Sequence, residues 1–88
     1  MENLEKQIKL AVEAFKTGRV SEAENLAEKL IILNPKVVFL YNLLGLILVE
    51  QKKIDQAIGC YEKGIRIDLY TFFIVFLSKI NFLLTNIN

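Results

Sequence analysis

The chain has 88 residues, 53% of them hydrophobic and 24% charged, which fits one small domain over residues 1–88. Eleven Lys and Arg residues against ten Asp and Glu residues give a net charge of +1, too even for electrostatic binding of nucleic acid. With one Cys and no His, the composition excludes a disulfide framework and a zinc module and removes the commonest general base. We therefore expect no cofactor, no bound metal and no catalytic residues.

The first two elements are predicted to be helices joined by a tight turn. Apolar residues recur at spacings of three and four from Leu4 onward, which is the periodicity of a helix. Gly18 suits a helix C-terminus, so we expect the first helix to end there. Ser21, with Glu24 three residues later, matches a capping box and predicts the start of the second helix. Pro35 ends that helix.

A third helix is expected over about residues 36–51. Its apolar run from Val37 to Val49 spans 13 residues, about 20 Å, which is too short to cross a hydrocarbon core of about 30 Å. A fourth helix is expected from about Gln56 to Ile67, with Asp55 as its N-cap.

A fifth helix is expected from about Tyr70 to Leu84 and is apolar on nearly all faces. Lys79 is the one charged residue in the final 20 residues of the chain. We do not favour a membrane-spanning helix here, because the apolar stretch is short and a lysine within it is costly.

The first four helices form an internal repeat of 34 residues. A shift of that length aligns both turns and pairs five identical residues. The identities are Leu10 with Leu44, Ala23 with Ala57, Glu28 with Glu62, Lys29 with Lys63, and Ile31 with Ile65. The predicted units are residues 4–37 and 38–71, followed by an atypical apolar tail over residues 70–88.

The residues of the second unit resemble the tetratricopeptide repeat family. The matching positions are Tyr41, Leu44, Gly45, Leu48, Ile54, Ala57, Tyr61 and Asp68. The first unit agrees at Leu10, Ala11, Ala14, Gly18, Val20, Ala23, Ala27 and the closing Pro35. The resemblance implies an all-α fold, a short helix–turn–helix solenoid, here with an apolar C-terminal helix. Gly64 and Leu69 depart from the family pattern, which has alanine and proline there.

In that family, the first helix of each unit lines a concave groove that binds a helix or a peptide segment. By position, the groove residues are Ile8, Val12, Phe15, Lys16, Phe39, Asn42, Leu46, Val49 and Glu50. A mostly apolar groove rimmed by Lys16 and Glu50 suits an amphipathic helix or an extended hydrophobic segment. The other interpretation is that the fifth helix, or a second copy of the chain, covers the groove.

The resemblance thus implies a non-catalytic, intracellular module that binds a protein or peptide partner. Two units are fewer than an independent solenoid usually needs, so we also expect a homo-oligomer. Two alternatives stay open. One is a cytoplasmic adaptor held peripherally at a membrane by residues 69–84, and the other is the N-terminal piece of a larger transferase with such repeats.

Overall fold

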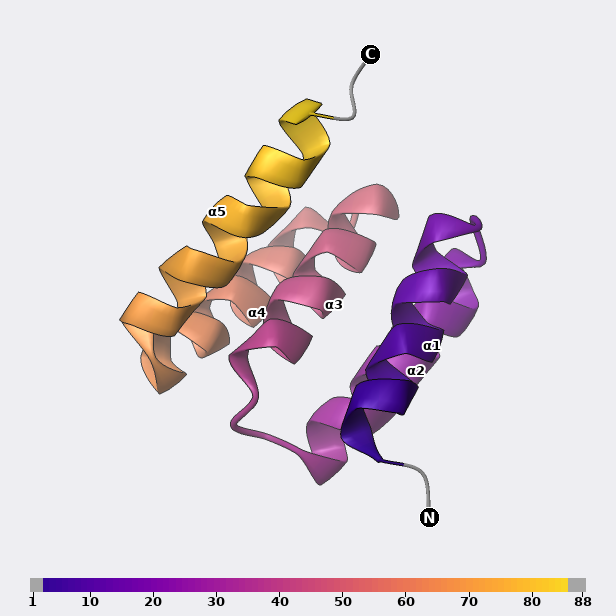
Figure 1. The fold of residues 1–88 in the computed structure, drawn as a ribbon, viewed down its shortest axis with the longest axis horizontal. Helices are drawn as coiled ribbons and strands as arrows, with labels where there is room; N and C mark the ends of the chain where they lie inside the picture. The colour runs from indigo at the N-terminus through magenta and orange to yellow at the C-terminus, as the bar shows by residue number, and fades with distance from the viewer. Residues whose placement is uncertain (1–2, 86–88) are drawn as a thin grey trace.

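The computed structural model describes residues 3–85 and shows five helices (Figure 1). In chain order they are α1 (Leu4–Lys16), α2 (Val20–Leu33), α3 (Val38–Glu50), α4 (Ile54–Ile67) and α5 (Leu69–Thr85). Helices α1 and α2 form one hairpin and α3 and α4 form the next, with α2 packed against α3. The predicted all-α helix–turn–helix solenoid is confirmed for the described residues.

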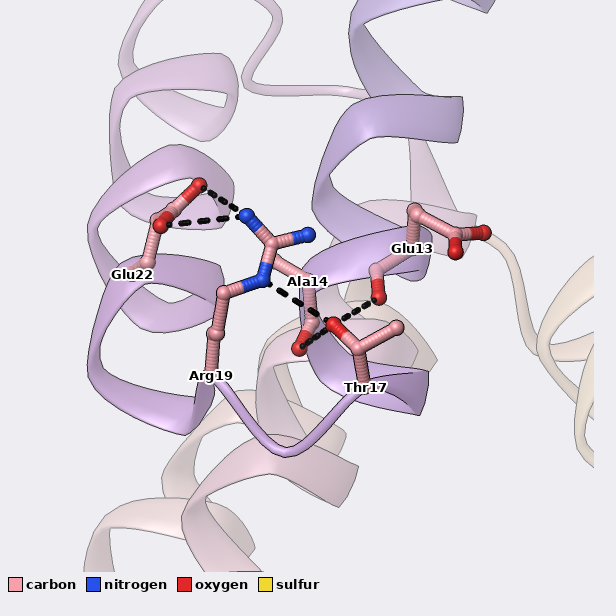
Figure 2. Close-up of polar contacts among 5 residues, drawn as sticks. All are labelled: Glu13, Ala14, Thr17, Arg19 and Glu22. Atoms are coloured by element: carbon pink, nitrogen blue, oxygen red, sulfur yellow. Dashed lines mark hydrogen bonds and ion pairs between the residues drawn. The ribbon is translucent and has the colours of Figure 1, made fainter.

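The turn between α1 and α2 is closed by a small polar network (Figure 2). Thr17 Oγ1 donates a hydrogen bond to the carbonyl oxygen of Glu13 at 2.8 Å and accepts one from Arg19 Nε at 3.0 Å. Arg19 also reaches forward to Glu22, with Nη1 and Oε2 3.2 Å apart. Gly18 has a φ of +84°, so the predicted glycine at the end of the first helix is confirmed.

The turn between α3 and α4 repeats this backbone geometry without a glycine. Lys52 stands at the position equivalent to Gly18 and has a φ of 64°. The next backbone N–H reaches back five residues in both turns, from Arg19 to Ala14 and from Lys53 to Leu48, at 2.8 Å each. The two units therefore share one turn conformation.

The predicted caps at Ser21 and Asp55 are wrong. The N-caps of α2 and α4 are Arg19 and Lys53, and neither makes a side-chain capping hydrogen bond. The tight turn returns the chain to helical geometry at Val20 and Ile54, so Ser21 and Asp55 already lie within the first helical turn. Helix α4 therefore begins two residues earlier than predicted. Two other boundaries also differ from the prediction: α3 is shorter at both ends, and α5 is longer by one residue at each end.

Helix α3 lies at the centre of the molecule and contacts all four other helices. Nine of its 13 residues are buried, including Leu40, Leu43 and Ile47. This burial explains the apolar run seen in the sequence, because a helix surrounded by neighbours has no face left for polar residues. Among residues 3–85, no helix is long and apolar enough to cross a membrane.

Two glycines allow aromatic rings to approach the helix backbone. A Cβ atom at Gly45 would lie 2.6 Å from Cε1 of Tyr61, so the ring of Tyr61 fills the space that a side chain at Gly45 would need. A Cβ atom at Gly64 would lie 3.1 Å from Cδ2 of Phe72. Glycine at position 64, which departs from the family pattern, thus brings α5 close to α4.

Helix α5 is attached through its N-terminal half. Asp68 caps it, since the carboxylate accepts hydrogen bonds from the backbone N–H of Tyr70 and Thr71 and, at 2.6 Å, from Thr71 Oγ1. These bonds lower the pKa of Asp68. Phe72 is buried, and its ring stacks on that of Phe76 with centroids 5.8 Å apart.

We predict that Gly45→Ala destabilises the protein by about 1–3 kcal/mol, because the added methyl group overlaps the Tyr61 ring. Gly59→Ala is the matched control. Its Cβ would meet nothing within 4 Å, so the better helix propensity of alanine should stabilise α4 by about 0.5–1 kcal/mol. Denaturant unfolding followed by circular dichroism measures both. Equal effects of the two variants would show that Gly45 is not required for close packing.

Candidate functional site

A groove lies between α1, α3 and α5 on the concave side of the two hairpins. It encloses about 540 Å³ and is lined mainly by apolar side chains. The lining residues are Val12, Phe15, Lys16, Gly18, Val20, Leu43, Leu46, Val49, Glu50, Lys79 and Phe82. Three of them are charged, two lysines and one glutamate, so the groove carries a small positive excess.

Six of the nine predicted groove residues lie together in this lining: Val12, Phe15, Lys16, Leu46, Val49 and Glu50. The other three lie elsewhere. Ile8 packs against the hydrophobic core. Asn42 lines a separate hollow beside α5, and Phe39 lies under the side chain of Lys79. Whether any of these residues binds a partner stays a prediction.

Two side chains of the C-terminal half of α5 contact the first helices of the two units. Lys79 Nζ lies 4.9 Å from the ring centroid of Phe39 on α3. Lys16 Nζ on α1 lies 5.8 Å from the ring centroid of Phe82 on α5. Both contacts are within the range of cation–π attraction. The fifth helix therefore covers the part of the concave face near Phe39 and Asn42, and leaves the part between α1 and α3 as the groove.

The electrostatics of the groove are dominated by its two lysines. Partial burial lowers the pKa of Lys79, and the positive charge of Lys16 lowers it further. Of the two salt bridges found among the described residues, neither involves Lys16 or Lys79. A carboxylate brought into the groove would therefore be attracted by both lysines.

Asn42 is the buried polar residue of the concave face. Asn42 is only 2% exposed, and neither Oδ1 nor Nδ2 of its side chain has a hydrogen-bond partner. It borders a hollow of about 30 Å³ beneath Phe76 and Lys79 of α5, which is large enough for one water molecule. An unpaired buried amide costs stability, because it loses its hydrogen bonds to water and gains none within the protein.

The sequence interpretation missed Leu43, Gly18, Val20, Lys79 and Phe82 as groove residues. Leu43 lies one helical turn before Leu46, so a wider apolar stripe on the third helix would have included it. Lys79 and Phe82 could not have been found in this way, because the family pattern does not place the fifth helix.

Two helical hairpins packed side by side, with a groove along their first helices, define a helical-repeat protein. Residues 40–70 match the family model described as "Tetratricopeptide repeat". The match covers most of the second unit, and it agrees with the resemblance that the residues of this unit predicted. No curated protein and no solved structure gives a significant match to the chain.

The family match agrees with a role in protein–protein interaction, because such repeats are typically non-catalytic scaffold modules. The groove fits this role. It combines apolar side chains for contact area with a few charged groups for orientation, the usual composition of a binding site.

We predict that Asn42→Leu stabilises the protein by about 1–2 kcal/mol, because it replaces an unpaired buried amide with an apolar side chain of similar size. Asn25→Leu, the same change at an exposed position of α2, should stay within about 0.5 kcal/mol of the parent. Thermal and denaturant unfolding measure both. A loss of stability in Asn42→Leu would show that the amide is paired in solution.

Proposed function

We propose that the chain is an adaptor that binds an apolar segment of another protein, helical or extended, in the groove between α1, α3 and α5. The observation that carries the proposal is the gathering of Val12, Phe15, Leu46 and Val49 from two separate repeats around one hollow. Burial of such side chains against an apolar ligand is the main source of binding free energy at a site of this kind.

The charged residues of the groove indicate which charge the partner segment should carry. Lys16 and Lys79 face the same space, and Lys79 is partly desolvated. A partner that carries an Asp or Glu beside its apolar residues would stabilise both ammonium groups. Glu50, the groove's one acidic residue, would repel a further carboxylate of the partner near the end of α3. We therefore favour an amphipathic segment with a single acidic residue.

We also infer that copies of the chain associate with one another, as the sequence led us to expect. The support is the amount of apolar surface on α5, where most large hydrophobic side chains are about half exposed or more. Exposed apolar patches of this extent mark contacts with other molecules.

The groove proposal predicts that peptides selected from a displayed random library on the full chain are apolar with one acidic residue. Val49→Asp, at a residue 44% exposed and so tolerant of substitution, should weaken their binding about tenfold or more. Fluorescence anisotropy of a labelled peptide measures the affinity.

Ile58→Asp is the matched control, because Ile58 on α4 is 49% exposed and does not line the groove. It should bind the peptide like the parent chain. Equal losses in the two variants, or selected peptides that bind Val49→Asp normally, would contradict the groove as the binding site.

A further inference from the structure

The outward face of α5 carries a regular apolar stripe. Tyr70, Phe73, Leu77, Ile80 and Leu84 follow one another at alternating spacings of three and four residues, and each is between 37 and 76% exposed. Ile80, the least exposed of them, lies at the edge of the stripe and also borders the hollow beside Asn42. This is the spacing with which one helix packs its side chains into the gaps of another helix. The inner face of the same helix, with Phe72, is already occupied by α3 and α4.

We propose that this stripe is the contact between two copies of the chain, and that α5 of one copy packs against α5 of the other about a two-fold axis. Such a contact is isologous, which means that one surface pairs with its own equivalent. The inference deepens the self-association proposed above, and it does not depend on what occupies the groove.

The charge distribution of α5 favours a second copy as the occupant. Lys79 is its one charged residue, and its side chain is directed inward over Phe39 on α3. The stripe itself carries no charge, so two identical faces meet without repulsion. A helix that lies on a membrane surface usually has several Lys or Arg residues beside its apolar face, and α5 has none there.

The size of the face also fits a dimer. Five large side chains, mostly more than half exposed, together with the neighbouring Ile74 at 49%, offer on the order of 600 Å² per copy, against about 800 Å² per partner in a standard interface. Contact between two such stripes would therefore bury at most about 1,200 Å² in total, the lower end of the range for specific complexes.

The groove stays accessible in this arrangement. Its α5 residues, Lys79 and Phe82, do not belong to the stripe, and the other lining residues lie on α1, on α3, or at Gly18 and Val20 around the first turn. A dimer formed through α5 would thus present two grooves, one on each copy.

The test is the molar mass of the full chain by size-exclusion light scattering across the micromolar range. We expect twice the chain mass of 10.1 kDa for the parent chain. Leu77→Glu places a charge at the middle of the stripe, so it should give the monomer mass with the helical circular dichroism spectrum unchanged. Leu33→Glu is the matched control on α2, where Leu33 is 73% exposed, and should remain dimeric.

A cross-link tests the geometry. Leu77 is the central residue of the stripe, so it meets its own equivalent whether the two helices run parallel or antiparallel in register. With Cys60→Ser as background, Leu77→Cys should form an intermolecular disulfide on mild oxidation. Ile32→Cys in the same background, at a residue of α2 that is more exposed than Leu77, should not.

Four results would overturn the inference. The first is a monomeric parent chain, and the second is a Leu77→Glu variant that remains dimeric. The third is a loss of dimerisation in Val49→Asp instead, and the fourth is co-sedimentation with phosphatidylcholine vesicles that depends on Leu77. The third would mean that the tail of one copy enters the groove of the other, and the fourth would assign the stripe to lipid. Peptide binding by Leu77→Glu, measured separately, distinguishes failure of this contact from failure of the groove.

Discussion

The burial of α3 among the other four helices is the constraint on which the remaining structure depends. A helix with nine of 13 residues buried needs neighbours on every side, and its apolar surface supplies the driving force that brings them together. Helices α1, α2 and α4 need only one apolar face each, which leaves their other faces free for charge. The groove lies where this enclosure is incomplete, beside Leu46, Val49 and Glu50 of α3.

Much of the fold could be predicted because it is repetitive. Spacings of three and four residues, one glycine and one proline locate the first two helices, and the 34-residue shift carries their register to the next two. The capping predictions at Ser21 and Asp55 were wrong, since a local pattern cannot show that a tight turn makes a side-chain cap unnecessary. The backbone carbonyls of Arg19 and Lys53 accept the first hydrogen bonds of α2 and α4, from Ala23 and Ala57 at 3.0 Å each, so each helix starts at the turn, before Ser21 or Asp55.

The site could be predicted only as far as the repeats extend. Helical spacing gathers Val12, Phe15 and Lys16 on one side of the groove and Leu46, Val49 and Glu50 on the other, and the structure brings these six together. The contribution of α5 depends on its direction across α3. That direction is determined by the contact of Phe72 with Gly64, by the rings of Tyr61 and Phe76, and by the burial of Asn42 beneath them. These contacts join the second unit to a helix that has no counterpart in the repeat.

The two turns show what holds each hairpin together. Gly18 adopts its left-handed conformation freely, whereas Lys52 adopts nearly the same conformation at a cost of about 1–2 kcal/mol. The second hairpin forms despite this cost, which the packing of α3 against α4 offsets. The turn residue of such a repeat can therefore differ between units as long as the facing helix surfaces pack together. A repeat of this kind can remain structurally intact after its turn motif is no longer recognisable.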